Sequence, residues 1–511
     1  MTVDHVELRG GVYHDSVTLM RITQAVTEAA GVLAGQVAMA TALNIELATA
    51  LGFAVPEQAG PNDLLVTVRG ADQDGVDAGL AALDAALQQA EQVAKSAGGL
   101  GDGPAPRTVR TATEQAPDAA VVLLSIPGPS VLGEAMDAIN AGRHPMIFSD
   151  NVPLEHEIAL KDAAAAARVL VMGPDCGTAI VGGVGLGFAN VLRSNGFATD
   201  TRVGVVAASG TGAQQLSCLL DEAGVGISHL LGVGGRDLSE AVGARSALAA
   251  LELLAADPGT DRIVVISKPA HPSAAEKLTA AAAAAGKPVT MLLIGSGAPD
   301  ITAGAESVLA EIGVPVPEWD SRGTAATSGG VLRGLFAGGT LADEAMVIAA
   351  AELGGIRSNI PLSPDLALPD SAVRQPVPDL AGLGHTVLDL GDDAFTAGRG
   401  HPMIDPTLRL DLIAATGSDP QVGVLLLDVV LGHCAEADPA ARLVPALTAA
   451  REAAAADGRE LAVVVSLCAT ASDPQGRDRQ RDALVAAGAA VFTSNAQAAR
   501  YAAGLAGKEQ Q

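Results

Sequence analysis

The chain has 511 residues, of which 49% are hydrophobic and only 2% aromatic, and its formal net charge is −27. This length predicts three or four domains at ~100–200 residues each, with cores built mainly from Ala, Val, Leu and Ile. The negative charge argues against binding to nucleic acid or to an anionic membrane surface, because both require a positively charged protein surface.

The four cysteines are scattered along the chain, with neither a CxxC pair nor a neighbouring pair of histidines. This distribution is typical of reduced thiols in the cytoplasm, and no metal site is predicted. The polar N-terminus lacks the apolar core of a signal peptide, and no run of ~18 apolar residues indicates a membrane span. We therefore expect a cytoplasmic protein.

Residues 1–96 are predicted to form a small α+β domain of the ferredoxin-like or ACT-like type, because strand patterns alternate with helical patterns. Asp15 and Ser16 are candidate caps of its first helix. No catalytic pattern is evident, so we interpret this domain as regulatory or as a unit for assembly. The Gly- and Pro-rich residues that follow predict a linker over 97–115.

From residue 116 onward, continuous apolar strands alternate with helices, which indicates parallel, doubly wound sheets. Three units are predicted, at 116–200, 201–320 and 321–511. The last two have the same order of elements, which indicates an internal duplication. The Gly-x-Gly-x-Gly run at 183–187 does not open a helix after a strand, so we do not interpret it as a dinucleotide-binding fingerprint.

Two turns of the same kind stand between a buried strand and a helix in the duplicated units. The free N–H groups at such a helix N-terminus can bind an anion, which the helix dipole also favours. For a single turn, an ordinary Ser or Thr cap is the alternative interpretation, and the second copy favours the anion site. The predicted ligands of a phosphate or carboxylate are Ser209, Gly210, Thr211, Gly212, Gly338, Gly339 and Thr340.

A Gly-rich loop after the predicted strand at 385–390 contains Arg399 and His401. The arginine could hold a carboxylate with two hydrogen bonds, and the histidine could act as a general acid or base. A structural loop with Arg–Asp pairing is the alternative. Arg236 is a further candidate for the anion, or it pairs with its neighbour Asp237.

Three other side chains lie at predicted strand ends. Cys176 has no evident base beside it, so a small buried residue is favoured over a nucleophile. Lys268 and His271 follow another strand, and the sequence leaves their roles open.

Two regions of the sequence resemble known protein families. Residues 169–180 (Val-Leu-Val-Met-Gly-Pro-Asp-Cys-Gly-Thr-Ala-Ile) followed by 203–220 resemble the α subunit of succinyl-CoA synthetase. Residues 331–353 and 385–500 resemble the C-terminal domain of its β subunit. The overall layout, including the long motif at 389–406, resembles the FdrA family.

The resemblance implies a fold for each predicted unit. Residues 116–200 correspond to a partial CoA-binding-like Rossmann domain. Residues 201–320 and 321–511 correspond to two flavodoxin-like succinyl-CoA-ligase domains, of α type and β type. The expected fold class is therefore α/β, with a small α+β domain at the N-terminus.

The sequence departs from the synthetases where their chemistry lies. Ile294-Gly-Ser-Gly-Ala-Pro-Asp300 stands where the synthetases have a phosphorylated histidine, and Lys268 stands where their orienting glutamate is expected. The N-terminal domain replaces the first half of the CoA-binding unit, and the sequence shows no ATP-grasp pattern. These departures speak against a histidine relay, CoA binding and ATP use. No cofactor is expected, and phosphate or carbamoyl phosphate would be a substrate.

The FdrA resemblance implies a subunit of an oxamate carbamoyltransferase-like enzyme of allantoin and purine catabolism, which transfers a carbamoyl group between oxamate and phosphate. The alternatives are an ADP-forming acyl-CoA synthetase of the succinate–CoA ligase type and a non-catalytic scaffold subunit. The expected partners are small anionic substrates and further enzyme subunits in an oligomer, with neither nucleic acid nor membrane.

Overall fold

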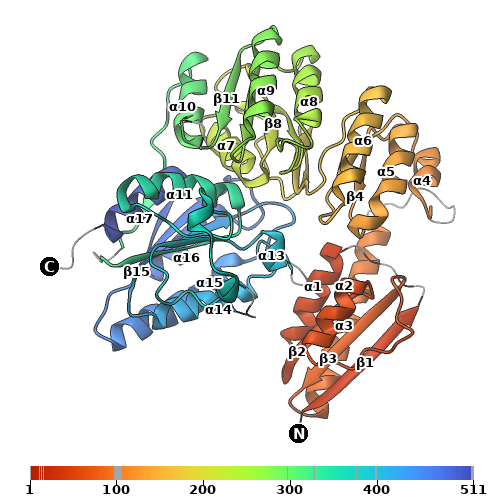
Figure 1. The fold of residues 1–511 in the computed structure, drawn as a ribbon, viewed down its shortest axis with the longest axis vertical. Helices are drawn as coiled ribbons and strands as arrows, with labels where there is room; N and C mark the ends of the chain where they lie inside the picture. Colours follow the sequence, from red (N-terminus) through yellow and green to blue (C-terminus); the bar gives the residue numbers. More distant parts are fainter. Residues whose placement is uncertain are drawn as a thin grey trace.

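The computed structural model describes residues 2–507 with the exception of 11, 13, 15, 97–105, 296, 298, 326–328, 374, 376 and 397–399. This part of the chain contains four β-sheets, and the predicted α/β class is confirmed. In Figure 1 the N-terminal unit (red) lies below the orange unit, and the green unit lies above the teal and blue C-terminal unit. Among the described helices, none is long and apolar enough to cross a bilayer.

Three antiparallel strands in the order β1-β3-β2 form the sheet of the N-terminal unit. Leu19, Val26 and Leu83 are buried between this sheet and its helices, which gives the unit a core of its own. The short helix α2 was not predicted, and the candidate cap Asp15 lies outside the described residues. The elements are β1 (Val3–Gly10), α1 (Ser16–Thr27), β2 (Val32–Met39), α2 (Ala42–Ala50), β3 (Asp63–Gly70) and α3 (Gln73–Ser96).

The second unit contains a small sheet. Within the described residues, β4 and β5 pair in parallel, and residues 169–172 add only one bridge, between Met146 and Met172. The predicted linker contains α4, where Thr108 and Thr111 form a capping box. The elements are α4 (Val109–Gln115), β4 (Val121–Leu124), η1 (Gly128–Ser130), α5 (Val131–Asn140), β5 (His144–Ile147) and α6 (Leu154–Ala167).

The third unit contains a six-stranded sheet in the order β11-β10-β8-β9-β6-β7. Strands β8 to β11 are parallel, and β6–β7 is a hairpin whose turn uses Gly182 and Gly183 at φ 57° and 80°, values that glycine accepts readily. The hairpin precedes the predicted boundary at residue 200 and nevertheless pairs with β9. The elements are β6 (Thr178–Val181), β7 (Val184–Gly187), β8 (Arg202–Ala208), α7 (Gly210–Glu222), β9 (Gly226–Gly232), α8 (Arg245–Ala256), β10 (Arg262–Ser267), α9 (Pro272–Ala284), β11 (Val289–Leu293) and α10 (Ile301–Glu311).

The fourth unit contains a sheet in the order β12-β17-β16-β15-β13-β14, in which only the edge strand β12 runs antiparallel among the described strands. Every residue of β15 is buried, as expected for a central strand covered on both faces. The elements are β12 (Ser321–Arg322), β13 (Val331–Phe336), α11 (Gly339–Leu353), η2 (Pro364–Leu366), α12 (Asp370–Val373), β14 (Thr386–Asp389), α13 (Asp393–Thr396), α14 (Thr407–Ser418), β15 (Val422–Val430), α15 (Pro439–Ala456), β16 (Ala462–Cys468), α16 (Arg477–Ala486), β17 (Ala489–Phe492) and α17 (Asn495–Ala506).

The two large sheets have the same strand order. Numbered along the chain, the parallel strands are arranged 2-1-3-4 in the third unit and 2-1-3-4-5 in the fourth, which confirms the predicted duplication and the doubly wound type. Helices α7 and α11 each follow strand 1 of their sheet. Both therefore begin where the strand order reverses, which is where sheets of this type bind ligands.

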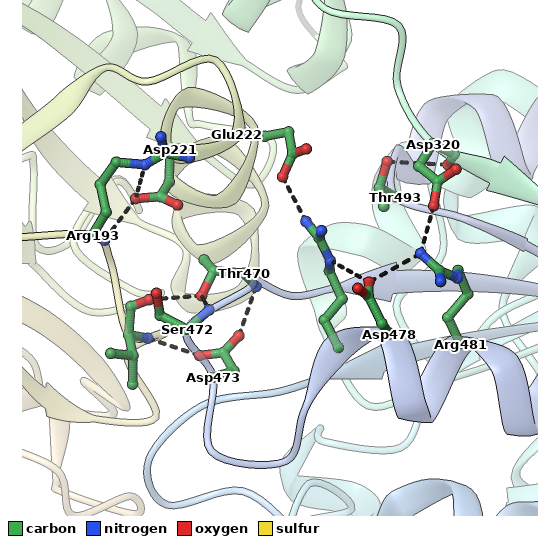
Figure 2. A network of polar contacts seen from close by, with 12 residues as sticks. Arg193, Asp221, Glu222, Asp320, Thr470, Ser472, Asp473, Asp478, Arg481 and Thr493 are labelled. Atoms are coloured by element: carbon green, nitrogen blue, oxygen red, sulfur yellow. Dashed lines mark hydrogen bonds and ion pairs between the residues drawn. The ribbon is translucent and has the colours of Figure 1, made fainter. Parts of the chain in front are cut away.

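Polar contacts join the third and fourth units, as Figure 2 shows. Asp473, in the loop after β16, accepts hydrogen bonds from the backbone of Thr470 (2.7 Å) and of Val191 (2.8 Å). Arg477 of α16 pairs with Glu222, the last residue of α7, at 2.5 Å. These contacts hold α7 against the fourth unit.

Candidate functional site

The N-termini of α7 and α11 meet at the carboxyl ends of the two large sheets. Ser209, the N-cap of α7, accepts a hydrogen bond from the backbone N of Gly212 at 3.0 Å. The same hydroxyl donates to Oγ1 of Thr340, in the first turn of α11, at 2.6 Å. The structure thus brings together the two turns that the sequence selects.

The contact between the helix ends leaves no room for an anion inside it. A Cβ added to Gly338 would lie 2.6 Å from Oγ1 of Thr211, and one added to Gly212 would lie 2.8 Å from Cγ2 of Thr340. Both distances are shorter than real Cβ contacts. Any ligand must therefore bind on the outer side of the contact.

The seven predicted ligands in the two turns consequently divide into two groups. Four of them are buried in the helix contact: Ser209, Gly212, Gly338 and Thr340. These residues join the two helices, and direct binding of an anion by each of them stays a prediction. Three remain accessible: Gly210, Thr211 and Gly339. Their N–H groups lie in the first helical turn, where no intrahelical acceptor exists.

Asp428 of β15 takes the place of a side-chain cap for α11, whose N-cap Gly338 has none. Its carboxylate accepts hydrogen bonds from the backbone N of Ala337 (2.7 Å) and of Gly338 (2.9 Å). Nη2 of the buried Arg409 bonds to the same carboxylate at 2.8 Å. Burial raises the pKa of Asp428, against the opposing effect of Arg409 and the two amides. This buried pair fixes the turn that precedes α11.

Lys268 follows β10 and places its ammonium at the N-terminus of α11. Its Nζ lies 3.8 Å from Oδ2 of Asp389. A Cβ added to Gly339 would lie 2.6 Å from that Nζ and 2.2 Å from that oxygen. Burial lowers the pKa of Lys268, but the charges of Asp389 and Asp343 are among those that outweigh it and raise the pKa. The side chain is 39% exposed, so a protonated ammonium is available on the accessible side.

Two buried carboxylates form the acidic side of the site. Asp389 is 2% exposed. Its backbone N donates a hydrogen bond to Oδ1 of Asn359 (3.0 Å), and its carboxylate oxygen Oδ1 accepts one from the backbone N of Gly391 (3.0 Å). Burial raises its pKa to about 6, although Lys268 acts in the opposite direction. Asp343 is 4% exposed, and burial raises its pKa to about 7 against the charge of Lys268.

His401 lies beside Asp389. A Cβ added to Gly391 would lie 2.8 Å from Nε2 of His401 and 3.2 Å from Oδ1 of Asp389. The ring packs against Phe188, with centroids 5.7 Å apart. Burial and then the charge of Lys268 lower the pKa of His401 to about 4, so the imidazole is neutral at pH 7. Arg399, predicted in the same loop, lies outside the described residues.

The guanidinium of Arg236 is bonded to residues in and just before α6. Its Nη2 lies 3.0 Å from Oε2 of Glu157 on α6 and donates to the carbonyl of Val152 at 2.7 Å. The alternative pairing with Asp237 is wrong, because Asp237 pairs with Lys161 at 2.8 Å. In this structure the guanidinium is therefore an element of the contact with α6.

The remaining candidates are structural. His271 caps α9, accepting from the backbone N of Ser273, whereas Lys268 belongs to the site. Burial raises the pKa of Cys176 to about 12, so it remains a thiol. Asp300 caps α10.

Sequence reasoning did not select Asp343, Asp389 or Asp428. Asp389 and Asp428 each interrupt or end an apolar strand, a pattern that could have found them. Asp343 gave no such signal, because an acidic residue in a helix usually faces solvent. Among the described residues, no group of three or more His, Cys, Asp and Glu side chains could hold a metal ion.

Two family models match the chain. Residues 335–505 match the model described as CoA-ligase, and they lie within the unit at 321–511 that the sequence predicts to be a succinyl-CoA-ligase-like domain. Residues 1–102 match the model described as AllF, heavy metal-associated domain. Those residues contain no cysteine.

Among curated relatives, the uncharacterized protein YahF of Escherichia coli K12 is 34% identical over 516 residues, covering 96% of each chain. The α subunit of the ADP-forming succinate–CoA ligase of Methanothermobacter thermautotrophicus is 28% identical over 192 residues, which are 38% of this chain and 62% of the relative. A solved acetyl-coenzyme A synthetase of Ca. Korarchaeum cryptofilum with phosphate and ADP is 15% identical, covers 79% of this chain and 85% of its own, and has a TM-score of 0.30.

Proposed function

We propose that this chain, which belongs to the family of the Escherichia coli protein YahF, is a subunit of a group-transfer enzyme. It would bind the phosphate group of an acyl or carbamoyl phosphate where the N-termini of α7 and α11 meet. The observation that supports the proposal is the Ser209–Thr340 hydrogen bond, because it sets two helix N-termini side by side at two switch points. Each N-terminus presents a positive partial charge, and Lys268 adds a full one.

In this proposal the phosphate binds the outer N–H groups of Gly210, Thr211 and Gly339, with Lys268 beside it. A nucleophile attacks the acyl or carbamoyl carbon and forms the new bond. The bond from that carbon to the phosphate oxygen breaks, and its electron pair leaves with the phosphate. The N–H groups and Lys268 stabilise the charge that develops on this oxygen. The reverse reaction uses phosphate as the nucleophile.

The first candidate is acyl transfer of the acid–thiol ligase type, with a thiol as the nucleophile. The CoA-ligase match over residues 335–505 and the succinate–CoA ligase relative support it. The loop Ile294-Gly-Ser-Gly-Ala-Pro-Asp300 has no histidine, so the phosphate would be used without a phosphohistidine. In this candidate, further subunits would supply the CoA and nucleotide sites.

The second candidate is carbamoyl transfer between oxamate and phosphate. The missing histidine and the AllF-type match over residues 1–102 favour it, because this chemistry requires neither phosphohistidine nor nucleotide nor CoA. Asp389, whose pKa is raised to about 6, would accept the proton from the attacking nitrogen, and the neutral His401 beside it would position the substrate. Arg399 would hold the carboxylate of oxamate.

Calorimetric titration of the full chain with inorganic phosphate, carbamoyl phosphate, acetyl phosphate and CoA tests the proposal. We expect the phosphates to bind and Lys268→Met to weaken them at least tenfold. The matched control is Lys277→Met, at an exposed position of α9, which should change nothing. Binding of CoA would favour the ligase candidate, and release of phosphate from carbamoyl phosphate on addition of oxamate would favour the carbamoyl candidate. Wild-type protein that binds none of the phosphates would contradict the proposal.

A further inference from the structure

Helix α1 of the N-terminal unit contacts the segment that leads from β15 into α15 of the fourth unit. Nε2 of Gln24 donates a hydrogen bond to Oε2 of Glu436 at 3.2 Å. The same Nε2 donates to Oε1 of Glu28 at 3.2 Å, and Glu28 in turn pairs with Arg442. In Figure 1, α1 lies on the side of its unit that faces the fourth unit. Two polar side chains of α1, one turn apart, therefore hold this segment.

An apolar contact accompanies these polar contacts. Met20 of α1 packs against the core cluster of the third and fourth units, which contains Met403. Its neighbour Arg21 donates from Nη2 to the carbonyl of Cys434 at 3.2 Å. The cluster that α1 covers thus includes a residue of the loop in which His401 lies.

The segment held by α1 holds the loop of His401 in turn. The backbone N of Glu436 donates to the carbonyl of Met403 at 2.7 Å, and the backbone N of Met403 donates to Nδ1 of His401 at 3.3 Å. Because Nδ1 accepts this bond, the neutral imidazole carries its proton on Nε2. That Nε2 borders the space beside Gly391, which Oδ1 of Asp389 also borders. The contacts of α1 therefore extend, through two backbone hydrogen bonds, to the nitrogen of His401 that faces the site.

A cavity lies between the loop of His401 and the segment that holds it. It is lined by Pro402 and Met403 of the loop and by Glu436 and Leu443 of the segment and α15. Atoms that line a cavity have fewer packing contacts than those of a close-packed interior, so the Glu436–Met403 hydrogen bond carries more of the connection. Arg409, which fixes the turn before α11, lines the same cavity. The loop thus has room to move when that bond is lost.

We propose that the N-terminal unit is a clamp on the site: α1 holds the segment at Glu436, this segment holds Met403, and Met403 fixes the proton of His401 on Nε2. Gln24 and Glu28 are then positioning residues, although they belong to another unit. This inference rests on the proposed function, in which His401 positions the substrate, and it adds a means of regulation, because release of α1 loosens the histidine.

A charge swap in the full chain tests the inference. Glu28→Arg brings two cations together, Arg442→Glu brings two anions together, and the double variant restores an opposite pair. In hydrogen exchange followed by mass spectrometry, the peptides with the amides of Met403 and Glu436 should exchange at least threefold faster in each single variant. The double variant should exchange at the wild-type rate. The matched control is Glu57→Arg, at an exposed loop position of the same unit, which should change nothing.

The nitrogen chemical shifts of His401 provide a readout that docking alone would not change. The protein is labelled with nitrogen-15 histidine, and the signal is assigned by its loss in His401→Gln. Wild type should show the tautomer protonated at Nε2, and Glu28→Arg should show a mixture of both tautomers that the double variant reverses.

Two results overturn the inference. One is unchanged exchange at Met403 and Glu436 in both single variants, with unchanged His401 shifts, because the N-terminal unit is then docked without acting on the site. The other is a double variant that restores neither readout. Absence of phosphate binding in calorimetry of wild type overturns the proposed function alone, since the exchange rates and nitrogen shifts decide the inference without a ligand.

Discussion

The hydroxyls of Ser209 and Thr340 lie 2.6 Å apart although 131 residues separate them in sequence. The bond joins the first helix of one doubly wound sheet to the first helix of its duplicate. Neither helix end forms the site alone, because the accessible amides come from both helices and the ammonium of Lys268 comes from a third element.

The Ser209–Thr340 hydrogen bond should appear as a coupling free energy when the unfolding of single and double variants is compared. Thr340→Val leaves a buried hydroxyl without its acceptor and should lower the free energy of unfolding by about 1–3 kcal/mol. Ser209→Ala also removes the cap of α7 and should cost about 1–2 kcal/mol. The double variant should cost less than the two single costs together, since both remove the same bond. Urea unfolding of the four proteins measures this, with the exposed Ser307→Ala as a neutral control, and strictly additive costs would contradict the coupling.

A methyl group at residue 339 should close the site. In Gly339→Ala the new Cβ would meet Asp389 Oδ2 at 2.2 Å and Lys268 Nζ at 2.6 Å, so both side chains must move. We expect phosphate affinity to fall at least tenfold in calorimetry. The control is Gly133→Ala in α5, where a Cβ meets nothing within 4 Å. Unchanged phosphate affinity in Gly339→Ala would show that the ligand binds elsewhere.

Replacing only one member of the buried pair Arg409–Asp428 should lower the free energy of unfolding strongly. Asp428→Leu leaves the buried Arg409 without its carboxylate and removes the acceptor for Ala337 N and Gly338 N. The expected loss is about 3–5 kcal/mol of unfolding free energy. Chemical denaturation measures it, and the exchange rates of the amide protons at residues 337 and 338 should rise with it. Protected amides in a folded variant would mean that another group caps α11.

The buried acid Asp343 should make stability depend on pH in a defined direction. Its pKa is about 7 in the folded protein against an ordinary value of 3.8. Between about pH 4 and 7 the unfolded chain has released this proton while the folded chain still holds it, so its contribution to stability falls as the pH rises and stays low above pH 7.

Asp343→Asn removes this contribution. Relative to wild type, the variant should gain stability from pH 4 to pH 8 by up to roughly 4 kcal/mol, and Asp118→Asn, at an exposed loop position, should show no such trend. Denaturant unfolding at both pH values measures the difference. If the stability advantage of Asp343→Asn over wild type instead shrinks at high pH, the pKa of Asp343 in the folded protein lies below its ordinary value.

Much of the fold could be predicted because each central strand is a continuous apolar run and each helix has a matching pattern. The duplication followed from the order of these elements alone. The β6–β7 hairpin was harder to assign, because the pairing of Ile180 with Leu230 depends on the finished sheet. Helix α4 was missed because its sequence lies next to a Gly- and Pro-rich stretch, whereas the Thr108–Thr111 capping box defines its start.

The site could be predicted only in part. The two turns were evident, but which of their residues face outward depends on how two helices from distant segments pack, and Gly212 and Gly338 are buried by that contact. Asp343 has the sequence context of a solvated helix face, and only tertiary packing buries it. The role of Lys268 could not be assigned from the sequence, because neither local structural propensity nor residue spacing determines its position beside Gly339.

The long separation between the two helices has a consequence for biosynthesis. The ribosome completes α7 at Glu222 and must add α11, through Leu353, before the second helix end exists. At about 5–20 residues per second this interval lasts roughly 7–26 s. A nascent chain can therefore complete its first large sheet well before the contact between the two helix ends can form, so this contact marks a late stage of translation rather than the folding of any one sheet.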